Sequence, residues 1–179
     1  MNQTVARSTD DDLRWAMQVV LASPVVCFRW SASNGWPVIF VSENVRQWGY
    51  TPEQLRLGQP CFAEMVHPDD LDRIGSEVMN HFTNGDASYE QEYRLLTADK
   101  RVAWVVDRTQ VTRDEHHLPI YLDGVLTDIT ERKQQQLRVA EALAEQQRLN
   151  QRLEAINNQL LQSEKMAAIG QLAAGIAHE

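Results

Sequence analysis

The C-terminal part of the chain constrains the fold most strongly, because it contains a long run without a helix-breaking residue. Proline is absent after Pro119, and neither glycine nor proline occurs between Glu131 and Glu164. Glutamine, glutamate, arginine, leucine and alanine dominate this run, and most of them are strong helix formers. The sequence therefore predicts a mixed globular part, followed over residues 131–164 by one long helix.

The apolar residues of this predicted helix form a narrow seam. Its positions alternate in steps of three and four: Val139, Ala142, Gln146, Leu149, Leu153, Ile156 and Leu160. This spacing is typical of a parallel coiled coil, which polar Gln146 interrupts once. A single amphipathic helix that folds back on the globular part is the alternative, but so narrow a stripe suits another helix better. We therefore expect a parallel homodimer through residues 131–179.

The seam changes phase after Leu160. The larger apolar residues that follow are Met166, Ile169, Leu172 and Ile176, which do not continue the earlier register. A break in a heptad pattern alters supercoiling locally. Such a break is a natural place for a two-stranded coil to become a four-helix bundle.

The chain ends on His178 and Glu179. If Ile176 faces the core of a bundle, His178 lies about 200° further round the helix and points outward. An exposed imidazole can act as a nucleophile toward phosphorus, and an adjacent carboxylate can hold or accept the ring proton. The alternative is a solvated histidine near a helix end, where the helix dipole favours it.

Glycine and proline divide the globular part into short elements. The sequence predicts a helix over 10–22, two strands over 25–31 and 37–42 joined at Asn34-Gly35, short helical turns between 43 and 65, a longer helix opened by Pro68 and closed by Asn84-Gly85, and three strands over 88–96, 101–112 and 119–127. We therefore expect an α+β fold, with a five-stranded antiparallel sheet that carries helices on one face. An N-terminal helix precedes it, and the long coiled-coil helix follows.

Composition and charge exclude several classes of function. A net charge of −8 opposes nucleic-acid binding, which depends on lysine and arginine. The longest apolar stretch, residues 15–30, is too interrupted to cross a bilayer, and Asp10 to Asp12 stand where a signal peptide would be positive. Cys27 and Cys61 are far apart and have no metal-binding spacing. We expect a cytoplasmic protein that binds no metal, nucleic acid or membrane.

The order of the predicted elements resembles a PAS sensory domain. The resemblance rests on His67-Pro68-Asp69-Asp70 at the start of the longer helix, Glu92-Tyr93-Arg94 in the third strand and Asp128-Ile129-Thr130-Glu131-Arg132-Lys133 at the exit, and it covers roughly residues 10–133. It implies a PAS sensory domain over 24–130, preceded by an N-terminal helix over 1–23 and followed by a coiled-coil signalling helix over 131–164. Residues 165–179 form a further segment, and their own resemblance, described below, implies the truncated start of a dimerisation and phosphotransfer helix.

The exit from the sheet is a predicted signal junction formed by Asp128, Thr130 and Glu131. Asp128 and Glu131 have the spacing of a capping box, with Asp128 as the N-cap. The long helix can then start directly from the last strand, which makes a rigid joint. We expect changes at Asp128 or Thr130 to uncouple sensing from output.

The stretch Ser163-Glu-Lys-Met-Ala-Ala-Ile-Gly-Gln-Leu-Ala-Ala-Gly-Ile-Ala-His178-Glu179 resembles the H-box of sensor histidine kinases of two-component systems. The resemblance implies that His178 is the phosphoacceptor and Glu179 its acid/base neighbour. It also implies a longer parent protein that transfers a phosphoryl group from ATP to His178 and then to the receiver domain of a response regulator. The glycine-rich ATP-binding boxes of that family do not occur in this sequence, so we expect this fragment to be inactive alone. The alternative is a non-enzymatic PAS coiled-coil module for dimerisation or protein interaction.

A ligand of a PAS domain lies between the sheet and the helices, if there is one. The positions suited to line such a pocket are Phe28, Trp30, Cys61, Phe62, Ile74, Val78, Tyr93 and Trp104, although core packing is the alternative for the aromatic residues. Cys61 stands roughly where LOV photoreceptors carry their flavin-reactive cysteine, but Pro60 and Phe62-Ala63 replace the polar residues of that motif. His81 lies near the end of the longer helix, where an axial haem ligand is not expected. Neither flavin nor haem is favoured.

Overall fold

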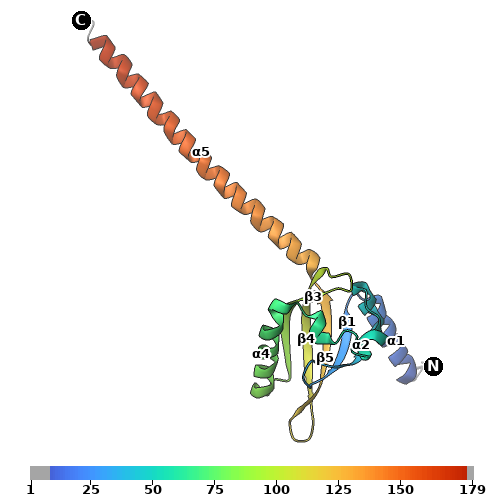
Figure 1. Cartoon of the computed structure of the whole chain (residues 1–179). Helices are drawn as coiled ribbons and strands as arrows, with labels where there is room; N and C mark the ends of the chain where they lie inside the picture. The colour runs from blue at the N-terminus through green and yellow to red at the C-terminus, as the bar shows by residue number, and fades with distance from the viewer. Residues whose placement is uncertain (1–8, 177–179) are drawn as a thin grey trace, which may run out of the picture. The chain divides into compact units, whose positions relative to one another are not determined.

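The computed structural model describes residues 9–176 of the chain (Figure 1). Its elements are α1 (Thr9–Ala22), β1 (Val26–Ser31), β2 (Val38–Val41), the 3-10 helix η1 (Glu43–Trp48), α2 (Pro52–Arg56), α3 (Phe62–Met65), α4 (Pro68–Asn84), β3 (Ser88–Leu96), β4 (Val102–Arg113), β5 (Pro119–Asp128) and α5 (Thr130–Ile176). The chain divides after Glu131 into two compact units, which are described separately.

The five strands form one antiparallel sheet in the order β2-β1-β5-β4-β3. The first and last strands of the fold are therefore neighbours, and Phe28 on β1 pairs with Gly124 on β5. The β1–β2 hairpin turns at Asn34-Gly35, where Gly35 has a φ of 78° that favours glycine. The predicted α+β fold with a five-stranded antiparallel sheet and a long C-terminal helix is confirmed.

The core lies on one face of the sheet, where alternate strand residues are buried under helices. Three of its rings pack together: Trp30 stacks on Phe28 at a centroid distance of 4.9 Å, and Phe62 from α3 meets Trp30 edge-on at 4.8 Å. Gly124 permits this packing, because a Cβ there would lie 2.4 Å from the Trp30 ring. The Trp30 indole therefore packs directly against the backbone of strand β5 at Gly124.

Helix α4 covers part of this face beside β3 (Figure 1). The His67 imidazole caps its start by accepting a hydrogen bond from the Asp69 amide, and Pro68 occupies the first helical position. Gly85 ends it in the left-handed conformation. Ile74 and Val78 are the buried apolar residues of the helix, which direct its inner face toward the sheet.

Helix α5 is 47 residues long and begins at Thr130, one residue before the predicted start. Its apolar seam faces solvent in the single chain. The large seam residues Val139, Leu149, Leu153, Ile156 and Leu160 are 46% to 67% exposed. Among residues 9–176, no helix is both long and apolar enough to span a membrane.

Candidate functional site

A small cavity lies between the sheet and helices α3 and α4. Its volume is about 20 Å³, and its lining consists of Trp30, Trp36, Phe62, Ile74, Val78, Tyr89, Gln91, Tyr93, Asp107, Thr109 and Leu122. The structure brings together here five of the positions suggested by the sequence, namely Trp30, Phe62, Ile74, Val78 and Tyr93. A space of this size holds about one water molecule.

The remaining suggested positions lie elsewhere. Phe28 is in the core behind Trp30, on which its ring stacks. Cys61 precedes α3, where its amide donates to the Glu64 carboxylate, and it lines a separate surface groove. Trp104 points to the opposite face of the sheet from its buried neighbour Val105, because side chains alternate along a strand.

The polar centre of the cavity is the Asp107 carboxylate on β4. Asp107 is only 5% exposed, and two hydroxyl groups donate to it: Tyr93 Oη to Oδ2 at 2.9 Å and Thr109 Oγ1 to Oδ1 at 2.8 Å. Burial raises the pKa of Asp107 to about 6, although the hydrogen bonds from Thr109 and Tyr93 work in the opposite direction. No ion pair found among residues 9–176 includes Asp107. Within the described residues, hydroxyl groups and no cation therefore stabilise the carboxylate.

Trp30 contributes an unused donor to the same region. Its Nε1 atom is buried and has no hydrogen-bond partner in the described part of the chain. Buried polar groups normally have partners, so this donor marks a site where a water molecule or a rearranged neighbour can bind. The lining of the cavity therefore includes a buried carboxylate and a tryptophan whose indole N–H has no partner among the described residues.

Gln91, Asp107 and Thr109 were not foreseen as pocket residues. A signal was nevertheless available, because Ala103, Val105, Asp107 and Thr109 alternate along β4 and share its buried face. A carboxylate at such a position is unusual enough to indicate a buried polar site.

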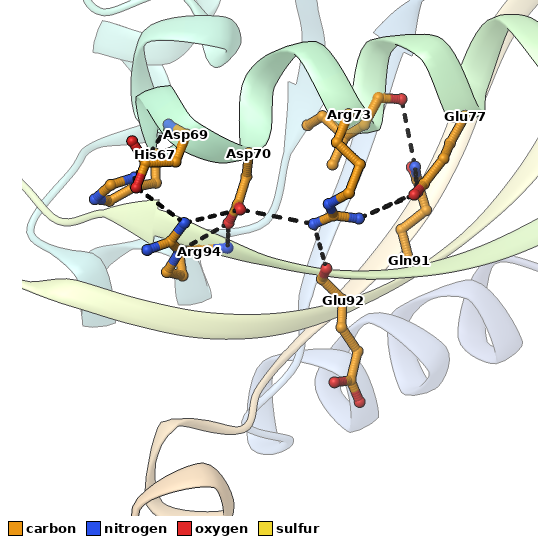
Figure 2. Close-up of polar contacts among 9 residues, drawn as sticks. His67, Asp69, Asp70, Arg73, Glu77, Gln91, Glu92 and Arg94 are labelled. Atoms are coloured by element: carbon orange, nitrogen blue, oxygen red, sulfur yellow. Dashed lines mark hydrogen bonds and ion pairs between the residues drawn. The ribbon is translucent and has the colours of Figure 1, made fainter.

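A cluster of charged residues joins the start of α4 to β3 (Figure 2). The Asp70 carboxylate accepts three hydrogen bonds from Arg94, from the backbone amide, Nε and Nη2, each at 2.9 Å. The Arg94 guanidinium holds the pKa of the buried Asp70 carboxyl below its usual range. The two motifs that resembled a PAS domain, at residues 67–70 and 92–94, thus meet in space.

The same cluster continues along α4 toward the cavity. Figure 2 shows the Arg73 side chain between Glu77 and Glu92: Nη1 lies 3.1 Å from Glu77 Oε1, and Nη2 donates to the Glu92 carbonyl at 2.9 Å. Gln91 Nε2 donates to Glu77 Oε2 at 2.7 Å. Because Gln91 also lines the cavity, these contacts fix α4 over the buried Asp107 site.

The start of α5 is held by neighbouring elements of the globular unit. Asp128 Oδ1 accepts from the Thr130 amide at 2.8 Å, and Oδ2 accepts from Trp48 Nε1 on η1 at 3.2 Å. The Trp104 amide on β4 donates to Thr130 Oγ1 at 2.9 Å, and its carbonyl accepts from Ile129 at 2.8 Å. The helix begins at Thr130, so Ile129 and not Asp128 directly precedes its first residue. Asp128, the predicted N-cap, therefore caps the helix from one position further back.

His178 and Glu179 lie outside the described residues. Within residues 9–176, no group of three or more histidine, cysteine or carboxylate side chains is arranged to hold a metal ion. The cavity does not fit a haem or a flavin, because such ligands occupy pockets of roughly 300 Å³ or more. His81 is engaged elsewhere: it bonds Asp86 at 2.7 Å and stacks on Tyr89.

Comparison with known proteins identifies the globular part. A family model described as PAS fold matches residues 38–126. Among curated proteins, the methyl sulfide methyltransferase-associated sensor of Methanosarcina acetivorans is 37% identical over 72% of this chain, and the two-component sensor PprA of Pseudomonas aeruginosa is 31% identical over 46%. The chain spans only 13% and 9% of these relatives.

A solved structure agrees with the family match. The sensory box histidine kinase/response regulator from Burkholderia thailandensis superposes with a TM-score of 0.60 at 25% identity, covering 75% of this chain and 98% of that chain. The globular part has the PAS fold, and its structural neighbours include PAS domains of sensor histidine kinases.

Proposed function

We propose that this chain, which carries a PAS domain, is the sensory and dimerisation part of a cytoplasmic sensor histidine kinase. The PAS fold and the similarity to sensor proteins support a role in signal detection. The H-box resemblance at residues 163–179 supports a kinase output in a longer protein. Because the chain spans a small fraction of its relatives, the activity of that longer protein is part of the proposal.

The proposed route of the signal runs from β5 into α5. Thr130 is hydrogen-bonded to Asp128 and to the Trp104 amide, so a shift of β4 or β5 changes the position of the first helical turn. This direct joint between sheet and helix is the observation that carries the proposal. The α5 seam, exposed in the single chain, then binds the same seam of a second copy as a parallel coiled coil.

The proposed output is phosphoryl transfer to His178. ATP bound elsewhere in the longer protein donates its γ-phosphoryl group: the bond between the γ-phosphorus and the bridging oxygen breaks, ADP leaves, and a bond forms between phosphorus and an imidazole nitrogen. Glu179 accepts the ring proton. The phosphoryl group then passes to an aspartate of a response regulator receiver domain. A histidine with an adjacent carboxylate is chemically suited to this role.

Phosphorylation of the longer protein that contains this chain tests the proposal. After incubation with ATP, we expect an acid-labile phosphoryl group that mass spectrometry locates on His178 and that is absent from His178→Gln. Glu115→Gln, a change in an exposed loop residue, serves as the control that keeps the label. Equal labelling of wild type and His178→Gln would overturn the kinase proposal. It would favour a non-enzymatic PAS module in which α5 serves dimerisation or protein interaction.

A further inference from the structure

Asp107 is a buried carboxylate whose charge has no counter-ion among the described residues. Both of its oxygens accept hydrogen bonds from hydroxyl groups, at 2.9 Å from Tyr93 and 2.8 Å from Thr109. A hydroxyl group can accept a hydrogen bond as well as donate one, whereas the cationic side chains of lysine and arginine can only donate. The site can therefore satisfy either the ionised or the protonated carboxyl group.

The other titratable groups around this cavity have their own partners. On β3, Tyr89 shares a hydrogen bond with Thr109, and Tyr93 donates to Asp107 itself. On α4, Glu77 is held by Arg73 and Gln91, while His81 bonds Asp86. The remaining elements contribute no titratable group to the lining, since Trp30 comes from β1, Phe62 from α3 and Leu122 from β5.

We infer that Asp107 is a proton-operated switch inside the PAS domain. One proton from solvent binds Oδ1, which forms an O–H bond and turns the carboxylate into a neutral carboxylic acid. Oδ1 then donates to Thr109 Oγ1, which until then donated to it. The Thr109 hydroxyl hydrogen must turn away toward another acceptor, and Tyr89 is the adjacent hydroxyl. Oδ2 keeps its hydrogen bond from Tyr93.

The reversed hydrogen bond lies at a crowded point of the sheet. Thr109 Oγ1 would stand 2.9 Å from a Cβ on Gly124, and the Trp30 ring lies against the same glycine. Reorientation of Thr109 therefore changes its contacts with β5 and with Trp30, whose Nε1 donor has no partner in the described part of the chain. Further along the same two strands, Val105 pairs with Asp128 at the junction with α5.

The pKa of Asp107 allows its protonation to change between pH 5 and pH 7. Burial raises the pKa of Asp107 to about 6, so the carboxyl is mainly ionised at pH 7 and mainly protonated at pH 5. The idea that this protonation is a signal for a histidine kinase depends on the function proposed above. Titration of Asp107 is measured on this chain alone. The protonation of Asp107 can therefore be disproved without disproving the kinase proposal, and the reverse also holds.

Titration of the whole 179-residue chain tests the switch. Carbon-13 NMR of aspartate-labelled protein, recorded from pH 4.5 to 8, should show one carboxyl that titrates near pH 6 and disappears in Asp107→Asn. Asp123→Asn is the matched control: Asp123 lies on β5, pairs with Arg29 in a more exposed position, and its loss should leave the transition unchanged. A transition that persists in Asp107→Asn, or no carboxyl titrating above pH 5 in the wild type, overturns the inference.

Two further variants keep the test decisive if Asp107→Asn does not fold. Tyr93→Phe removes a donor to the ionised carboxylate, and the midpoint should rise by roughly one pH unit. His81→Gln removes a histidine that stacks on the cavity residue Tyr89, and the carboxyl transition should remain. An unchanged midpoint in Tyr93→Phe, or loss of the transition in His81→Gln, would show that Asp107 does not carry the proton.

Discussion

Asp70 is the residue that most firmly attaches α4 to the sheet. It accepts three hydrogen bonds from Arg94, and its own side chain is only 10% exposed, whereas that of Arg94 is half-buried. Asp70→Ala leaves the Arg94 amide and guanidinium without their acceptor, so we expect the free energy of unfolding to fall by about 2–3 kcal/mol. Urea unfolding at pH 7 measures the loss. Asp72→Ala, an exposed change on the same helix, should cost less than about 0.5 kcal/mol.

Because the pKa of Asp70 is lowered in the folded protein, its contribution to the free energy of unfolding depends on pH. Its stabilisation is present above the pKa of an unfolded aspartate, about 4, and is lost as the pH falls through the lower folded value. An Asp70→Ala variant as stable as Asp72→Ala would contradict this role.

Asp107 should have the opposite effect on stability. Its folded pKa of about 6 lies above that of an unfolded aspartate, so its contribution is full below pH 4 and is lost as the pH rises through 6. This group alone should make the domain roughly 1 kcal/mol more stable at pH 5 than at pH 7. In Asp107→Asn that increment should vanish, as judged by urea unfolding at both pH values. The same increment in both proteins would show that another group is responsible.

Gly124 should tolerate no side chain. A Cβ at this position would lie 2.4 and 2.6 Å from two atoms of the Trp30 ring, which Phe28 and Phe62 hold in place. Gly124→Ala should therefore lower the free energy of unfolding by about 1–3 kcal/mol. Gly75→Ala is the matched control, because its Cβ would lie 3.9 Å from Trp36 and the change suits a helix interior. It should raise the free energy of unfolding by roughly 0.5–1 kcal/mol, and urea unfolding of both glycine variants measures the two changes.

At the scale of single elements, the α5 seam predicts a dimer. Leu153 lies on the seam and is 64% exposed in the single chain, whereas Leu143 lies off the seam and is 54% exposed. Leu153→Asp should shift the chain from dimer to monomer in sedimentation equilibrium, because it buries a carboxylate in the helix contact. Leu143→Asp should stay dimeric. Equal behaviour of the two variants would contradict the seam.

The elements were largely predictable because their signals are local. Asn34-Gly35 indicated the first hairpin, Pro68 and Gly85 the ends of α4, and the run without glycine or proline indicated α5. These residues act through their own backbone preferences or through a periodic pattern, so a single sequence displays them. The α5 start was displaced by one residue, because Thr130 gains partners from a distant strand.

The site was only partly predictable because it depends on contacts between strands. The sequence predicts Trp104 as a pocket residue because its ring could stack on a planar ligand, yet its position in β4 turns it to the opposite face from Val105. Asp107 was missed, although it alternates with buried residues of that strand. Which residues share a face requires the register of the sheet, and the partners Tyr93 and Thr109 become visible only with that register.

At the scale of the whole molecule, the chain joins a PAS domain to a helix of 47 residues through one hydrogen-bonded junction. We expect a joint of this kind to transmit rotation or a change of register, neither of which a flexible linker would transmit. Our central claim is that the PAS domain controls phosphorylation of His178 through the rotational phase of α5. The claim depends on the helical period and is independent of the identity of the signal.

The most direct test is a series of insertions in α5 after Gln147 in the longer protein, with one to seven residues added. Phosphorylation of His178 is measured for each variant. We predict that output varies with helical phase. Insertions of two or five residues rotate the downstream helix by nearly half a turn and should alter output most, whereas three or four residues make roughly one turn and should alter it less. Insertion of seven should restore the original level, since seven residues complete a heptad. Output that stays constant across the series, or that declines steadily with length, would contradict transmission through α5.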